Sequence, residues 1–160
     1  MKININAIYI SEGHNYRGRH EIGSLDFPII EKENIKCIES KGIVGDRFYD
    51  LKEDFKGQIT FFDCAVYDAL SQEVKGEYPI SAVRRNVMTQ GVDLNSLIGK
   101  EFSINGVKFR GSEECAPCYW MDEACGEGAE DFLKGRGGLR ARILTSGELK
   151  VGENQLELLD

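Results

Sequence analysis

Two cysteines separated by two residues are the part of this sequence best suited to chemistry. Cys115 and Cys118 enclose an Ala-Pro pair in the stretch GSEECAPCYWMDEAC, residues 111–125. A cysteine pair with this spacing can help to bind zinc, can form a reversible disulfide, or can present one reactive thiolate. A thiolate of the last kind acts as a nucleophile, a carrier of persulfide sulfur or a ligand for a soft metal.

The first two alternatives lack part of their usual context, although the residues leave both open. A structural zinc site needs four ligands, and only Cys125 or a distant histidine could supplement Cys115 and Cys118. A thioredoxin-like dithiol is expected within a βαβ unit, whereas this pair follows a predicted hairpin. The sequence therefore favours a reactive thiolate, with a structural zinc or redox dithiol module as the alternative function.

Of the two cysteines, Cys118 is the better candidate for the reacting group. Pro117 precedes it and fixes the local turn, and the residues at 119–121 are large and could wall a pocket. Cys115 instead follows two glutamates, whose negative charge disfavours a thiolate. We therefore predict that Cys118 is the functional cysteine and that Cys115 assists it.

A pair of adjacent arginines lies upstream of the cysteines. Arg84 and Arg85 belong to AVRRNVMT, which predicts a strand, so their side chains should face opposite ways. One of them can then face a cleft, where its planar guanidinium suits phosphate. Asn86 and Thr89 would add neutral hydrogen-bond partners to this anion clamp. An exposed pair on an edge strand is the alternative, to which the local residues give even weight.

Two further polar motifs are weaker signals. In GIVGDRF, glycine backbone would shape a pocket with Asp46 and Arg47 at its mouth, or else form a tight turn with a surface ion pair. GHNYRGRH contains both histidines, His14 and His20, whose spacing does not fit a helical metal site. This stretch predicts a solvated loop, with a cover for an anionic ligand as the alternative.

The elements that must position these residues are mostly short strands. Asn105-Gly106 lies between two alternating runs, the strongest short-range signal for a hairpin. From Asp63, a good N-cap, the apolar period becomes helical over about residues 64–75. LRARILTSG and LKVGENQLELLD predict two closing strands with Gly147 in the turn between them. Strands do not alternate with long helices, so the pattern predicts a mainly β fold, a β-barrel with a few peripheral helices outside it.

The composition limits the classes of function. The chain has 160 residues, which predicts a single domain over residues 1–160, and a net charge of -7, which disfavours nucleic-acid and membrane-surface binders. The start lacks the features of a signal peptide and no apolar run is long enough to span a membrane, so we expect a cytoplasmic protein. Five cysteines, an odd number, argue against a disulfide framework, and Cys37 and Cys64 lie in apolar runs that predict core positions.

Several stretches together resemble the MOSC domain, named for the C-terminal domain of molybdenum cofactor sulfurase. In order, they are GIVGDRF, RRNVMTQGVDLNSLIGKEF, GVKFRG followed by CAPC, and GLRARILTSGELKVGE. The best matches run from Gly42 onward, and the opening stretch is similar to small stand-alone bacterial members. The resemblance implies a β-barrel, in agreement with the strand pattern.

The resemblance also implies roles for particular residues. Cys118 matches a cysteine that either ligates the metal of the molybdenum cofactor (molybdopterin) or carries sulfur, and Cys115 matches a second cysteine that often precedes it. Arg84, Arg85 and Asn86 match the stretch expected to hold the anionic, phosphate end of the pterin.

Larger relatives add domains that we do not expect here. These are a second, N-terminal β-barrel in the amidoxime reductases and a pyridoxal-phosphate desulfurase domain in the sulfurases. The resemblance therefore implies a partner, either a cysteine desulfurase or an electron-transfer protein. The activities it implies are sulfur transfer and the reduction of N-hydroxylated compounds.

Overall fold

Short β-strands dominate the computed structural model, which describes residues 1–13, 28–74 and 76–159. The strands are β1 (Lys2–Ile10), β2 (Ile30–Lys32), β3 (Asn34–Ile38), β4 (Gly42–Ile43), β5 (Ile59–Asp63), β6 (Val87–Gln90), β7 (Glu101–Ile104), β8 (Val107–Glu114), β9 (Leu139–Ile143), β10 (Gly147–Lys150) and β11 (Gly152–Leu158). The α-helices are α1 (Cys64–Glu73), α2 (Trp120–Cys125) and α3 (Ala129–Leu133), and the 3₁₀ turns are η2 (Ile80–Val83) and η3 (Leu94–Leu97).

Seven of these strands close into a barrel. The hydrogen-bonded order is β11-β7-β8-β9-β5-β6-β1, and a further pairing between β1 and β11 completes the ring. The sheet is mixed, because β5 and β6 run parallel while the other pairs of the ring are antiparallel. β2 extends the edge of β1, and β10, β3 and β4 form a separate small sheet. This closure removes the exposed sheet edges and confirms the predicted β-barrel.

A bulge in β1 changes which residues of this strand point into the barrel and which point outward. Its pairing register with β6 shifts between Ile5 and Ala7. Before the bulge, Ile3 and Ile5 point into the barrel core, whereas after it the inward residues include Ile8. Ala7 packs instead against an apolar cluster outside the barrel. An extra residue of this kind reverses the alternation, which is why the sequence pattern weakens along this strand.

The barrel interior is a packed hydrophobic core. Phe61, Phe102 and Phe109 are almost fully buried and lie close together, with the rings of Phe61 and Phe109 5.6 Å apart in an edge-to-face arrangement. Aliphatic side chains from β1, β9 and β11 fill the remaining space. Burial of this apolar surface is the main stabilising contribution, at roughly 25 cal/mol per Å².

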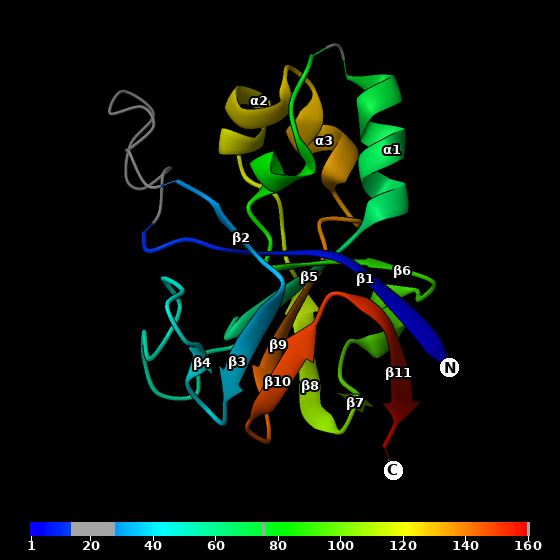
Figure 1. Ribbon diagram of the computed structural model, residues 1–160. Coiled ribbons are helices and arrows are strands. Elements are labelled where there is room, and N and C mark those ends of the chain that lie inside the picture. The colour runs from blue at the N-terminus through cyan, green and yellow to red at the C-terminus, as the bar shows by residue number, and fades with distance from the viewer. Residues whose placement is uncertain (14–27, 75, 160) are drawn as a thin grey trace.

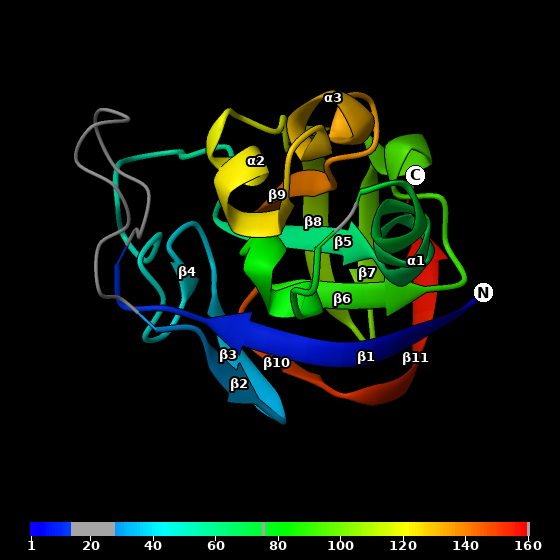
Figure 2. The ribbon, with the colours of Figure 1, turned by 90° about the horizontal axis from the view of Figure 1, so that it is seen from above.

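The three helices gather on one side of the barrel (Figures 1 and 2). α1 begins where predicted, because the Asp63 side chain accepts a hydrogen bond from the Ala65 N–H and so caps the helix. A second apolar cluster, which includes Phe62 and Leu70, joins this helical layer to the outer face of the barrel. The predicted placement of the helix outside the barrel is therefore confirmed.

Two sequence-based expectations for local structure are wrong. Arg84 and Arg85 do not lie on a strand, because β6 starts only at Val87 and Arg84 follows η2 in a left-handed conformation, with φ 56° and ψ 40°. Gly147 is the first residue of β10 rather than a turn residue, so the C-terminal region contains three strands instead of two. His14 and His20 lie outside the described residues. None of the helices in the described ranges is both long and apolar enough to cross a membrane.

Candidate functional site

A cavity of about 310 Å³ lies outside the barrel, between its wall and the layer of α2 and η2. Four arginines and two cysteines line it: Arg47, Arg84, Arg85, Arg140, Cys115 and Cys118. None of the described residues that line the cavity is acidic. In a chain with 27 acidic residues and a net charge of -7, this concentration of guanidinium groups gives the cavity a local excess of basic side chains.

The barrel wall forms the floor of this cavity. Thr60 of β5 and Arg140 of β9 are partners in the antiparallel pairing of these strands, and both line the cavity. Along β9, Leu139 and Ala141 point into the barrel core, so the alternation of the strand turns Arg140 outward. Gly57 completes the floor and leaves it bare of a side chain.

The cysteine segment forms one side of the cavity and is joined to the barrel by backbone contacts. The Cys115 N–H donates to the Gly138 carbonyl at 2.7 Å directly after β8. A Cβ on Gly137 would lie 2.2 Å from the Cys115 carbonyl oxygen, so only glycine allows this approach. Cys118 precedes α2, and its carbonyl accepts a hydrogen bond from the Met121 N–H.

The two cysteines of the segment differ sharply in accessibility. Cys115 is buried, with 4% of its surface exposed, whereas Cys118 is exposed at the edge of the cavity. Of the three large residues predicted to wall a pocket, Trp120 and Met121 line the cavity, whereas Tyr119 does not. The accessible thiol is the one ranked first from the sequence.

Arg85 is buried and connects three segments around the cavity. Its guanidinium donates to the carbonyl oxygens of Val83, Gly137 and Cys115, at 2.9, 3.0 and 3.2 Å. These bonds join η2, the start of β9 and the cysteine segment. Arg85 thus lines the cavity, but its contacts are those of a residue that positions the cysteine segment.

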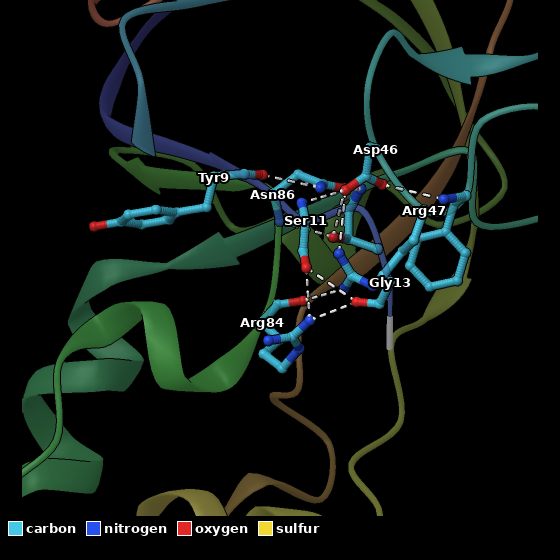
Figure 3. A network of polar contacts seen from close by, with 9 residues as sticks. Tyr9, Ser11, Gly13, Asp46, Arg47, Arg84 and Asn86 are labelled. Carbon is cyan, nitrogen blue, oxygen red and sulfur yellow. Dashed lines mark hydrogen bonds and ion pairs between the residues drawn. The ribbon is translucent and has the colours of Figure 1, made fainter. Parts of the chain in front are cut away.

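Arg84 belongs to a separate polar network, shown in Figure 3. Its Nη2 donates to Ser11 Oγ at 3.0 Å and to the Gly13 carbonyl at 2.8 Å. The Arg84 carbonyl in turn accepts a hydrogen bond from Arg47 Nη2 at 2.9 Å. Asp46 accepts from the Ser11 N–H and from Arg47, which closes the network. The network holds the chain after β1 against the mouth of the cavity.

Arg47 places an almost inaccessible guanidinium at the cavity. It forms an ion pair with Asp46 at 3.1 Å, in which both side chains are almost inaccessible, and lies over the Phe48 ring. Burial lowers the pKa of Arg47, and the neighbouring Arg85 acts in the same direction, while Asp46 opposes both. Among the described residues, Arg47 Nε is buried without a hydrogen-bond partner. A buried donor left unpaired costs about 1–3 kcal/mol, which an anionic ligand could recover.

Asn86 and Thr89, predicted to join an anion clamp, do not line the cavity. Asn86 accepts hydrogen bonds from both the N–H and the hydroxyl of Thr60 and donates to the Tyr9 carbonyl. Thr89 is fully buried and donates to the Phe62 carbonyl. Both residues hold β5 and β6 in register behind the cavity. Asp46 likewise lies behind the cavity, where it positions Arg47.

Several residues at the cavity had no signal in the sequence. Arg140 lies in an ordinary alternating strand, and Phe48 and Phe55 lie in a polar connection, so only the folded chain brings them together. The remaining cysteines stay outside the cavity lining. Burial raises the pKa of Cys37 to about 12 and that of Cys125 to about 11, which makes both poor nucleophiles near neutral pH.

The alternative of a structural zinc site gains no support from this geometry. Within residues 1–13, 28–74 and 76–159, no group of three or more His, Cys, Asp or Glu side chains could hold a metal ion. Cys115 and Cys118 therefore have no described ligands to complete a tetrahedral site. All five cysteines are free thiols in this structure.

Comparisons with known proteins agree with this architecture. The sequence model of the MOSC domain matches residues 45–154. The structure of YuaD from Bacillus subtilis is similar over 100% of this chain and 98% of its own, with a TM-score of 0.74 and 15% identity. YiiM from Geobacillus stearothermophilus has a TM-score of 0.66 and 12% identity over 99% of this chain and 75% of its own. YiiM from Escherichia coli has a TM-score of 0.64 and 14% identity, over 98% and 70%. No curated protein matches the chain.

Proposed function

This chain belongs to the MOSC domain family, and on that premise we propose that its arginine-lined cavity binds the molybdenum cofactor, with Cys118 as the metal ligand. The observation that carries the proposal is one cavity in which the guanidinium groups of Arg47 and Arg84 lie together with the accessible Cys118 thiol, in an acidic chain. Guanidinium groups suit the phosphate of the pterin, and a thiolate suits a soft metal.

The residues present fit such a group. Arg47 and Arg84 supply positive charge at the cavity mouth, and Arg47 Nε is a buried donor without a described partner. Cys118 supplies the sulfur ligand, and the ring of Trp120 walls the same cavity. When bound, the cofactor supplies redox chemistry at its metal, and reduction of N-hydroxylated compounds with a separate electron donor is the activity to assay.

The residues of this chain position the cysteine segment and supply the positive charge of the guanidinium groups. Arg85 joins the Cys115 carbonyl to the carbonyls of Val83 and Gly137, and so fixes the start of the segment that carries Cys118. The side chains of Trp120 and Met121 exclude water from one wall, which strengthens the attraction between an anion and the nearby guanidinium groups.

A second candidate function is sulfur transfer, which the exposure of Cys118 favours. A cysteine desulfurase would present a persulfide, and the Cys118 thiolate would attack its outer sulfur. The bond between the two donor sulfurs breaks, the desulfurase thiolate leaves, and Cys118 holds the transferred sulfur. The buried Cys115 is too inaccessible for this encounter.

The test is to purify the protein from a molybdenum-replete host and measure molybdenum and pterin per chain. We expect wild type to retain both and Cys118→Ser to lose the metal. Cys64→Ser, which removes a thiol outside the cavity, is the matched control and should behave as wild type. Incubation with a cysteine desulfurase and cysteine, followed by cyanolysis, tests the sulfur function on the same variants. Equal metal, pterin and persulfide in wild type and Cys118→Ser would refute both functions.

A further inference from the structure

Arg140 supplies a cationic group to the cavity that is separate from the network around Arg84. It lies on the barrel floor, with its strand in register with β5 on one side and β8 on the other. On β9 it is two residues beyond Gly138, which accepts the hydrogen bond from the Cys115 N–H. The register with β8 pairs Arg140 with Glu113, two residues before Cys115, so Arg140 lies beside the start of the cysteine segment.

Among the residues that the structure describes, the charge of Arg140 is only weakly neutralised. Its ion pair with Glu113 is long, at 3.7 Å, while Lys56 holds the same Glu113 oxygen at 2.7 Å. A β-bulge between Gly111 and Glu113 places Glu113 opposite Arg140. With Lys56 as the closer partner of this carboxylate, Arg140 can exchange its contact for another anion at little cost.

Aromatic side chains surround this end of the cavity. A Cβ on Gly57 would lie 3.2 Å from the Phe55 ring and 3.5 Å from Arg140 Cδ, so the ring and the arginine converge over this bare glycine. Phe55 stacks with Phe48 at 5.6 Å between centroids, and Arg47 lies over the Phe48 ring, which fixes both rings in place. Because the two rings stack on each other and carry Arg47 and Lys52 over their faces, a flat ligand ring would gain contacts with their edges.

We propose that Arg140 binds the carboxylate of a planar, aromatic or heteroaromatic substrate, whose ring lies against Phe48 and Phe55. The inference deepens the proposed function, because it assigns the substrate class of the same cavity. An arginine fork recognises a carboxylate through two parallel N–H···O bonds, which a neutral amide cannot reproduce. The cofactor would occupy the Arg47 and Arg84 side and the substrate the Arg140 side.

Binding can be followed without any cofactor, since Trp120 is the only tryptophan of the chain and lines the cavity. The probe is benzoate, with benzamide as its neutral counterpart, titrated while tryptophan fluorescence is recorded. We expect wild type to prefer benzoate and Arg140→Gln to bind it about tenfold more weakly, with no loss for benzamide.

Arg142→Gln is the matched control, because Arg142 lies two residues further along β9 on the same outer face, bound to Asp54 and outside the cavity lining. It should retain the preference for benzoate. If wild type does not discriminate between the two probes, or if Arg140→Gln retains the discrimination, the proposal is overturned.

The same variants separate this inference from the proposed function. Arg140→Gln should keep the molybdenum and pterin content of wild type, and Cys118→Ser should keep benzoate binding. Loss of benzoate discrimination in Arg140→Gln supports the substrate subsite even if wild type carries no cofactor. A cofactor-loaded wild type that binds both probes equally would retain the proposed function and remove the subsite.

Discussion

The interior of the barrel and the cavity on its outer face use the same strands for opposite purposes. β9 shows this most clearly, because Leu139, Ala141 and Ile143 enter the packed core while Arg140 between them lines the cavity. The core contains closely packed rings and aliphatic chains, whereas the cavity combines guanidinium groups with thiols. The barrel is thus a packed support, and the candidate site lies on its outside, where loops and short helices add the remaining walls.

This comparison implies that the two regions should respond differently to substitution. Changes in the core should lower stability without a specific effect on ligands. Changes at the cavity should alter ligand binding with smaller losses of stability. Arg85 is an exception, because its side chain donates hydrogen bonds to three backbone carbonyls.

Phe61→Ala should cause the largest loss of stability. Phe61 is almost fully buried and contacts the rings of Phe102 and Phe109, so truncation leaves a cavity in the barrel core. We expect the free energy of unfolding to fall by about 3–5 kcal/mol, measured by urea denaturation. Phe48→Ala, at the cavity wall, is the comparison and should cost less because Phe48 is only partly buried. Equal losses would contradict the division between core and cavity.

Arg85→Met should cost about 3 kcal/mol, because it leaves the buried carbonyls of Val83, Gly137 and Cys115 without their donor. Arg84→Met should cost less than about 1 kcal/mol, since the Arg84 side chain is only partly buried and water can replace its contacts. Unfolding curves of the two variants under identical conditions test this difference between neighbours. A larger loss for Arg84→Met would reverse the assigned roles.

Much of the architecture follows from local sequence signals. The hairpin at Asn105-Gly106 forms as predicted, with positive φ at both residues, which that pair accommodates. The cap at Asp63 starts α1 at the expected position. Such features are local, because turn chemistry and capping depend on residues adjacent in the chain. Cys37 and Cys64 are likewise buried, as their apolar surroundings predict.

The cavity could be predicted only in part, because its walls come from distant segments. The pattern around Arg84 and Arg85 is typical of a strand, but Arg84 is instead the left-handed residue that ends η2. The two side chains therefore bind different segments, Arg84 the Gly13 carbonyl and Arg85 the Gly137 carbonyl. Asn86 and Thr89 are polar residues whose hydrogen bonds are satisfied within the barrel wall, which no local pattern reveals. The position of Arg140 at the cavity could not be predicted from the sequence, because it depends on the pairing of β9 with β5.

Alkaline pH should weaken the core through its buried thiols. Burial raises the pKa of Cys37 from 9.0 to about 12, so the unfolded chain ionises first and stability falls as pH rises from about 9 toward 12. At about pH 10 this thiol should account for a loss of about 1.4 kcal/mol relative to about pH 8. Urea denaturation of wild type and Cys37→Ala at both pH values measures the effect. The same pH dependence in both proteins would exclude this thiol as the cause.

Arg84→Gly should be slightly more stable than Arg84→Ala, and the difference measures the backbone strain at this position. Arg84 has φ 56°, a region that costs non-glycine residues about 1 kcal/mol. Glycine relieves this cost while alanine retains it, so we expect Arg84→Gly to be about 1 kcal/mol more stable than Arg84→Ala in thermal or urea unfolding. Both should bind phosphate more weakly than wild type. If alanine is as stable as glycine, the backbone at this position is not strained.

Native mass spectrometry of protein isolated from a molybdenum-replete host tests the role of Cys118, because the measured mass includes every group that the chain retains. We expect wild type to carry added mass, either the molybdenum cofactor or a persulfide sulfur. We expect Cys118→Ser to carry neither the metal nor the sulfur, while Cys64→Ser matches wild type. Identical spectra for wild type and Cys118→Ser would contradict the assignment of Cys118 as the reacting residue of the cavity.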